Sequence, residues 1–200
     1  MRIFHPLSGV CAAVLIAACL APAAAQSGLH PVSDPKGLFS ISIPSDWSVA
    51  NSRMSDAVFH GLRSSAVGQN VVSTLAAHSG MGDTGVPAIL AVAAVDLPER
   101  VPPAAFAEAV KDKMPSGWEV TQDGRASIAG RDAHYLYFIM HQTDYALYMV
   151  MAYFNVGRTG FLAVGGTLNE PESIRKHFAT ISQILETFRP SQKLGAFTLR

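Results

Sequence analysis

The fold of this chain is decided by its longest apolar stretch, Ala133–Phe154, which reads AHYLYFIMHQTDYALYMVMAYF. The polar run His141–Asp144 interrupts it, so we expect two antiparallel strands joined by a hairpin with Gln142 and Thr143 near its tip. Alternation along each strand divides the side chains between two faces. One face carries His134, Leu136, Phe138, Met140, Tyr145, Leu147, Met149 and Met151, and the other carries Tyr135, Tyr137, Ile139, Ala146, Tyr148, Val150 and Phe154. Because both faces are apolar, we expect both to be covered by helices.

Two amphipathic helices can supply this cover. The first is predicted over residues 101–114, where prolines open the segment and apolar residues repeat at a spacing of four. The second is predicted after Asn169, which can act as its N-cap with Glu172 as the capping-box partner, and it ends before Pro190. The apolar stripe of this second helix consists of Ile174, Phe178, Ile181, Leu185 and Phe188.

Further strands surround the hairpin in the sequence. The clearest is Leu38–Ile43, which alternates strictly and stops at Pro44. Other strands are predicted over 86–97 and 159–168, as two short strands over 118–121 and 126–129 around an Asp123–Gly124 turn, and more weakly over 57–62 and 70–76. Together the elements predict one α+β domain over residues 36–190, a three-layer α/β/α sandwich with a central, mostly antiparallel sheet.

The order of these elements resembles a known fold family. Its features here are an opening strand that ends in a proline and a tryptophan (Gly37–Trp47), a mid-chain helix, the segment Gly130–Ala133 before the hairpin, and a closing helix that ends at Ile184–Phe188. This succession resembles the Mog1/PsbP-like fold over residues 36–190. That family includes exported bacterial lipoproteins, photosystem accessory subunits and a small-GTPase-binding protein, so the resemblance implies an accessory or binding domain. It carries over no functional residue.

The N-terminal residues 1–25 have the features of an export signal. Arg2 is followed by an apolar run, Val10–Leu20, and by the small residues Ala23–Ala25 before Gln26. The apolar run is shorter than the roughly 20 residues that a membrane-spanning helix needs. We therefore expect cleavage after Ala25 and a periplasmic or secreted protein.

Two further expectations concern the ends of the chain. Residues 26–35 contain two prolines and no periodicity, which predicts a linker, and residues 191–200 are predicted to be a C-terminal tail. As an alternative to cleavage after Ala25, Ile16–Cys19 resembles a bacterial lipobox. In that case Cys19 would be lipidated, and the protein would be anchored to the cell envelope.

Composition excludes several classes of function. The 200 residues contain 15 basic and 15 acidic side chains, so the chain lacks the basic excess that binding to nucleic acid requires. Both cysteines, Cys11 and Cys19, precede Ala25. A chain cut after Ala25 can therefore form no disulfide, catalytic thiol or cysteine-bound zinc site.

Site residues are few. No GxSxG or HExxH motif is present, and we predict no catalytic residue, no metal ligand and no cofactor. The hairpin tyrosines Tyr135, Tyr137 and Tyr148 are candidate ligand-binding residues, because an aromatic ring with a polar tip suits an interface or a groove. Core packing beneath a helix is the alternative role for the same side chains.

Three functional hypotheses follow. The first is an exported, non-enzymatic accessory or binding domain whose partner is an unknown protein or cell-envelope component, with membrane contact only through a lipid at Cys19. The second is a hydrolase or metal-binding protein whose site is assembled from scattered residues, with Asp83, His60, His78 and His141 as candidates. The third is a small-ligand carrier with a pocket between the sheet and one helix.

Overall fold

A computed structural model of the protein describes residues 28–51, 53, 55, 59, 70–80, 86–97 and 99–195. The predicted signal segment with Cys19 lies outside the described residues, as do the candidates Asp83 and His60. The strand predicted over 57–62 also lies outside them, except for Phe59, which is helical and buried.

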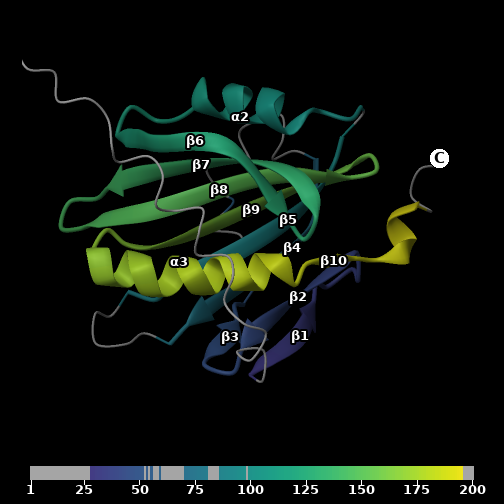
Figure 1. The fold of residues 1–200 in the computed structure, drawn as a ribbon, viewed down its shortest axis with the longest axis horizontal. Helices are drawn as coiled ribbons and strands as arrows, with labels where there is room; N and C mark the ends of the chain where they lie inside the picture. The colour runs from purple at the N-terminus through teal and green to yellow at the C-terminus, as the bar shows by residue number, and fades with distance from the viewer. Residues whose placement is uncertain are drawn as a thin grey trace, which may run out of the picture.

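The described part of the chain is mostly strand (Figure 1). Its strands are β1 (Leu29–Ser33), β2 (Phe39–Pro44), β3 (Trp47–Val49), β4 (Val71–Ser79), β5 (Ile89–Asp96), β6 (Trp118–Ile128), β7 (Arg131–His141), β8 (Ala146–Val156), β9 (Thr159–Leu168) and β10 (Arg189–Pro190). The helices with described bounds are α2 (Pro103–Lys111), α3 (Pro171–Glu186) and the short 3-10 helix η4 (Gln192–Gly195). No helix of the described residues is both long enough and apolar enough to span a membrane.

The main sheet contains seven strands in the order β3-β4-β5-β9-β8-β7-β6, and all of its neighbouring strands are antiparallel. The predicted hairpin is confirmed as β7 and β8, with Ala146 opposite His141 and Tyr153 opposite His134. The predicted strands 86–97 and 159–168 are β5 and β9. Long apolar strands that pair with their neighbours in sequence therefore build most of this sheet.

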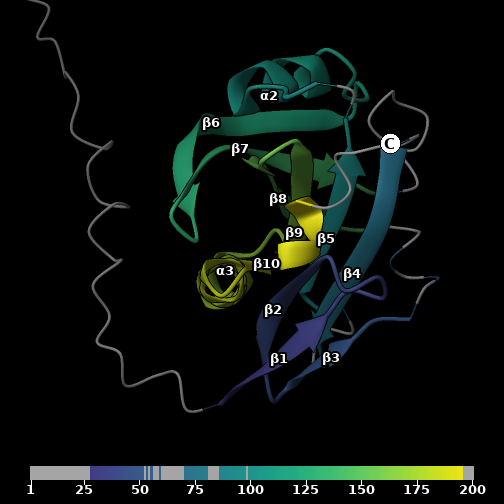
Figure 2. The same ribbon diagram turned by 90° about the vertical axis from the view of Figure 1, so that its right-hand side faces the viewer.

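Both faces of the sheet are covered, as predicted (Figure 2). Helix α2 packs over one face, where Phe106 stacks on Tyr153 with ring centroids 3.9 Å apart. Helix α3 packs over the other face, where Ile181 and Phe188 meet the core side chains of β8 and β9. The α+β class and the three layers are thus confirmed.

The layer that contains α3 also contains a second sheet, which the sequence did not predict. In this sheet β2 lies between β1 and β10, and both pairings are antiparallel. The buried residues of β2, Phe39, Ile41 and Ile43, face the same core as α3. The predicted alternation of this strand is therefore confirmed, but its partners are not in the main sheet.

The linker expected over residues 26–35 is wrong for Leu29–Ser33, which forms β1. The side chain of Asp34 anchors the turn that follows. This residue is 3% exposed, and its carboxylate accepts hydrogen bonds from the backbone N–H of Leu38 and Phe39 at 2.5 and 2.8 Å. It also accepts one from the hydroxyl of Ser73 in β4 at 2.5 Å, which ties the second sheet to the main sheet.

Two other local predictions are wrong. The segments 118–121 and 126–129 are parts of one continuous strand, β6, and the turn lies at Ala129 and Gly130, whose φ angles are +48° and +75°. Helix α3 has Glu170 as its N-cap residue, without a capping hydrogen bond from a side chain, so the capping box expected at Asn169 and Glu172 is not formed. Here Pro171, in the first turn, removes one of the N–H groups that a cap would satisfy.

Candidate functional site

Strand β6 is a long, exposed edge of the main sheet. It has 11 residues, of which eight are exposed, and among the described residues it pairs with no strand other than β7. In an edge strand every second residue directs its backbone N–H and C=O away from the sheet. The opposite edge, β3, has 3 residues. The two ends of the sheet therefore differ strongly in the backbone they offer to a partner.

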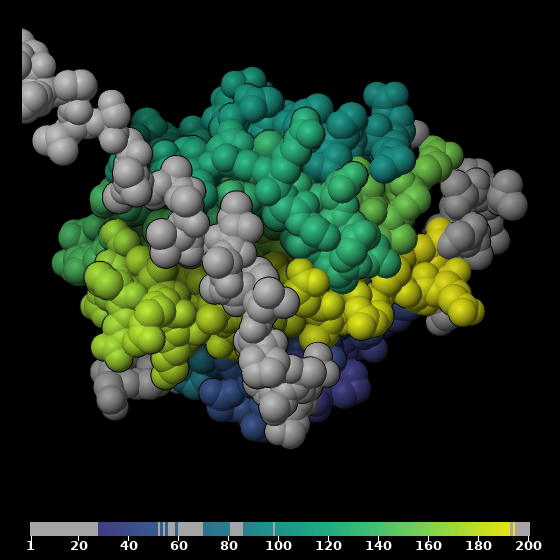
Figure 3. Space-filling view, in the orientation of Figure 1, coloured from purple at the N-terminus to yellow at the C-terminus, as the bar shows by residue number. Residues whose placement is uncertain are grey.

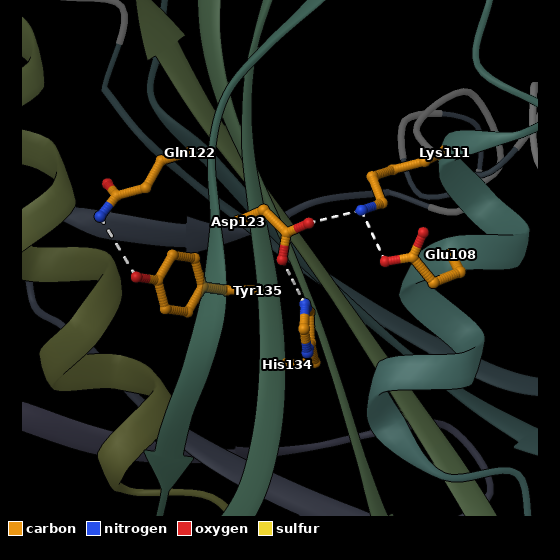
Figure 4. Close-up of polar contacts among 6 residues, drawn as sticks. All are labelled: Glu108, Lys111, Gln122, Asp123, His134 and Tyr135. Atoms are coloured by element: carbon orange, nitrogen blue, oxygen red, sulfur yellow. Dashed lines mark hydrogen bonds and ion pairs between the residues drawn. The ribbon is translucent and has the colours of Figure 1, made fainter.

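A polar network fixes β6 on the side that α2 covers (Figure 4). The carboxylate of Asp123 in β6 accepts from Nζ of Lys111 in α2 at 2.5 Å and from Nε2 of His134 in β7 at 2.6 Å. Lys111 also lies 2.6 Å from the carboxylate of Glu108, one helical turn earlier. The network joins α2, β6 and β7 through their side chains.

Register and helix geometry explain why these groups meet. Arg125 lies directly opposite His134, so Asp123, two residues earlier on the same face of β6, is its diagonal neighbour. Glu108 and Lys111 are three residues apart on α2, which places them on one face of the helix. A continuous β6 is required, because a turn at Asp123 would break this register.

The charged groups of the network shift the pKa values of Asp123 and Lys111 in the expected directions. The hydrogen bond from Lys111, followed by that from His134, lowers the pKa of Asp123 below its ordinary value of 3.8. The bonds to Asp123 and then to Glu108 raise the pKa of Lys111 above 10.5. The carboxylate of Asp123 and the ammonium group of Lys111 are therefore both charged at neutral pH.

The His134–Asp123 pair does not form a catalytic triad with the described residues. His134 is 9% exposed, and its Nδ1 has no hydrogen-bond partner there. The ring borders a cavity of about 10 Å³ between α2 and the sheet, whose other lining residues are Phe106, Ala107, Val110, Leu136, Met151 and Tyr153. This space is near the lower limit for one water molecule, and its lining contains no serine, threonine or cysteine that could act as a nucleophile. We interpret the pair as a structural tie between strands.

The three candidate tyrosines gather on the opposite face of β7 and β8. Tyr137 stacks on Tyr148 at 5.7 Å and meets Tyr135 edge-on at 5.2 Å, while Phe178 of α3 lies 5.6 Å from Tyr137 and 5.2 Å from Tyr148. All three are half-buried, and burial raises the pKa of Tyr137 above 10. The hydroxyl of Tyr135 accepts a hydrogen bond from Gln122 of β6 at 3.2 Å. Packing beneath Phe178 of α3 explains the positions of Tyr137 and Tyr148, and ligand binding by the three tyrosines stays a prediction.

The scattered candidates for a metal or hydrolase site are not brought together where the structure describes them. His78 lies in β4 and His141 ends β7, with β5, β9 and β8 between these strands. Four strand spacings of about 4.8 Å separate the two strands across the sheet. The described residues contain no group of three or more His, Cys, Asp or Glu side chains that could hold a metal ion.

Sequence reasoning missed β6 as a site, although a signal was present. Most residues of Trp118–Ile128 are polar on both faces, which is typical of a strand that no layer covers. The dipeptide Asp123–Gly124 suggested a turn instead. In the fold Gly124 serves another purpose, because a Cβ at this position would lie 2.8 Å from the hydroxyl oxygen of Tyr135. In the space-filling view, residues of β6 form part of the surface between α2 and α3 (Figure 3).

Comparisons with known proteins concern the fold. No family model matches the chain, and no curated protein matches it in sequence. Among solved structures, cyanobacterial PsbP from Synechocystis is similar with a TM-score of 0.51 at 12% identity, covering 92% of this chain and 98% of that one. LpqN of Mycobacterium tuberculosis, described as involved in cell envelope biogenesis, has a TM-score of 0.52 at 12% identity, with coverages of 80% and 88%.

Two further structures extend this likeness. The Ran-binding protein Mog1p of Saccharomyces cerevisiae has a TM-score of 0.51 at 10% identity, covering 81% of this chain and 95% of that one. A Bacteroides thetaiotaomicron protein has a TM-score of 0.53 at 12% identity over 82% of this chain, which spans only 48% of that protein. The chain therefore has a Mog1/PsbP-like fold, as the sequence predicted. Identities this low establish the fold alone.

Proposed function

We propose that this protein is an exported, non-catalytic binding domain of the cell envelope, and that the β6 edge is where it binds a protein partner. The observation that carries this proposal is the exposed 11-residue edge strand at one end of a sheet whose other edge has 3 residues. An extended segment of a partner can add to such an edge through main-chain hydrogen bonds.

The edge has some of the features by which proteins protect exposed strands, such as the charged side chains of Glu119, Asp123 and Arg125, but it lacks others. Its sequence, WEVTQDGRASI, contains no proline and no lysine, and eight of its 11 residues are exposed although Lys111 of α2 reaches Asp123. A bulge between Val120 and Gln122 interrupts the ladder near one end. Residues 122–128 then continue in regular register with β7, so a partner strand would meet an uninterrupted stretch of strand there.

The similar structures support a binding role. Mog1p is described as Ran-binding, and LpqN as involved in cell envelope biogenesis. The export signal predicted over residues 1–25 supports a location in the periplasm or outside the cell. The described pocket beside α2, at about 10 Å³, is far smaller than a ligand site of roughly 300 Å³ or more, so the carrier hypothesis gains no support from it.

Site-specific photocrosslinking in the native host tests the binding proposal. A photoreactive residue replaces Ala126, which is exposed in β6, and a matched one replaces Ala179, which is exposed on α3. We expect a discrete protein adduct from position 126 and none from position 179. The partner is then purified, and its affinity is compared for the wild type, Ala126→Lys and the control Ala179→Lys.

A charged lysine in the middle of the edge should weaken binding by at least about tenfold, because it disrupts strand addition, while the lysine on α3 should not. Equal binding by both variants, or no adduct at position 126, would refute the assignment of the edge.

The intact mass of the exported protein tests its location and its processing. A chain that starts at Gln26 supports a freely diffusing protein, whereas a diacylated chain that starts at Cys19 supports a lipid anchor. An uncleaved chain found only in the cytoplasm would contradict the export part of the proposal.

A further inference from the structure

Resting on the proposed binding role of β6, we infer that the strand added to this edge comes from a second copy of the same chain. Two β6 strands would pair antiparallel about a twofold axis at Gly124 and would join two main sheets into one. The inference comes from the order of charged side chains along the exposed edge and from the twofold symmetry that most dimers of identical chains have.

Symmetry restricts the possible registers. A twofold axis perpendicular to the sheet makes two β6 strands antiparallel and keeps α2 on the same side in both copies, so directly opposed residues must share a face. Asp123 and Arg125 lie on one face of β6, as their partners Leu136 and His134 in β7 show. The axis must therefore pass midway between the two copies of one residue, so that this residue lies opposite itself. Such a residue is described below as lying on the axis.

Charge selects one register among those that remain. With Gly124 on the axis, Asp123 lies opposite Arg125 of the other copy, and the reciprocal pair forms as well. With Asp123 or Arg125 on the axis, like charges lie directly opposite each other. With Gln122 on the axis, Asp123 lies opposite Thr121, at the bulge, where regular pairing stops. Of these registers, the one with Gly124 on the axis places two pairs of oppositely charged side chains directly opposite each other.

The side chains are available for these pairs. Arg125 is exposed, and no residue of the described chain forms an ion pair with it. The carboxylate of Asp123 accepts one hydrogen bond on each oxygen, from Lys111 and His134, so each oxygen keeps a free lone pair. The network with α2 and β7 thus holds Asp123 in position for the arginine of the second copy.

The paired segment would be short. The bulge between Val120 and Gln122 limits regular pairing to residues 122–126 of each copy, which gives five cross-strand pairs. Gly124 has no side chain at the axis, and a Cβ there would lie 2.8 Å from the hydroxyl oxygen of Tyr135 in the same copy. An interface of this length is small, so we expect a weak dimer whose population rises with protein concentration.

Sedimentation equilibrium of the purified full chain over a wide concentration range tests the inference. The wild type should show a monomer–dimer equilibrium, and Arg125→Glu should raise the dissociation constant by at least about tenfold, because two attractive pairs become repulsive. Asp123→Lys should have the same effect. An equimolar mixture of the two variants should dimerise again, because both cross-strand pairs then carry opposite charges. Arg175→Glu, at an exposed position on α3, is the matched control and should behave like the wild type.

Amide hydrogen exchange provides a second measurement, since Asp123→Lys also removes the bond to Lys111 and can unfold the protein. Amides of residues 122–126 should gain protection with concentration in the wild type and in Arg125→Lys, but not in Arg125→Glu. A wild type that stays monomeric, or Arg125→Glu that dimerises as well as the wild type, would overturn the inference. If the monomer still forms an adduct with another protein at position 126, the binding proposal stands without self-pairing. With no adduct of either kind, both fail.

Discussion

Asp34 offers a sharp test of how the two sheets are held together. Its carboxylate is 3% exposed and accepts hydrogen bonds from three backbone amides, those of Lys36, Leu38 and Phe39, and from the hydroxyl of Ser73. We therefore expect Asp34→Ala to lower the free energy of unfolding substantially, since the amides of Leu38 and Phe39 would lose their acceptor in a buried place.

The magnitude follows from these bonds. A hydrogen bond to a charged group contributes about 1.5–3 kcal/mol to stability. Asp34→Ala removes two such bonds from buried amides but also removes the cost of desolvating the carboxylate, so we expect the free energy of unfolding to fall by about 3–5 kcal/mol. Asp34→Asn keeps one oxygen that can accept from both amides, and it should lose only about 1–2 kcal/mol. The control is Asp144→Ala at the exposed hairpin tip, where a change within about 0.5 kcal/mol is expected.

Urea denaturation followed by tryptophan fluorescence measures all three variants, since Trp47 and Trp118 lie in β3 and β6. Hydrogen exchange at the amides of Leu38 and Phe39 should accelerate in Asp34→Ala. If this variant loses no more stability than Asp144→Ala, the turn is not held by its carboxylate, and the reasoning is refuted.

Three further changes test the packing and the charges. Gly160→Ala should destabilise the fold by about 1–3 kcal/mol in urea titrations, because the new Cβ would lie 2.6 Å from the hydroxyl oxygen of the buried Tyr153, while Gly117→Ala, which meets nothing within 4 Å, should be near neutral. Burial raises the pKa of Tyr153 to about 12 from 10, so the unfolded state ionises first and stability should fall by about 2–3 kcal/mol between pH 10 and pH 12. Tyr153→Phe should lack that share of the alkaline loss, and an unchanged pH profile would contradict the burial argument. Lys111 lowers the pKa of Asp123 below 3.8, so the ion pair stabilises the fold at neutral pH, and this stability is lost as pH falls through the lowered pKa. In Lys111→Met the free energy of unfolding should therefore fall less on acidification than in the wild type. An identical decrease in both proteins would show that the pair does not stabilise the fold.

Much of the fold could be predicted from sequence, because alternation along the hairpin strands assigns each side chain to one of two faces and both faces are apolar. Phe138 and Val150 belong to opposite faces by alternation alone, and each is buried under the helix layer expected there. Strand β1 was not predictable in this way, since its polar residues and Pro31 give no period. It is held by pairing with β2 and by Asp34, and both are contacts that depend on the finished fold.

The candidate site was less accessible to sequence reasoning. The tyrosines were predicted to share a face and do so, but Phe178, which packs over Tyr137 and Tyr148, comes from a helix whose docking no local pattern specifies. The Asp123–His134 bond requires residues 11 apart to meet across a ladder. That ladder follows from the turn at Ala129 and Gly130, whose residue types give a weaker turn signal than Asp123–Gly124 does.

The arrangement of the second sheet has a practical consequence for surface-based assays. Strand β1 flanks β2 in this sheet and lies at the bottom of both views, whereas β6 lies near the top (Figures 1 and 2). A biotin or an affinity handle placed just before β1 would orient immobilised molecules with β6 turned toward the flowing analyte. Immobilisation through lysines is less suitable, because Lys111 contacts Asp123 and its modification would disturb β6.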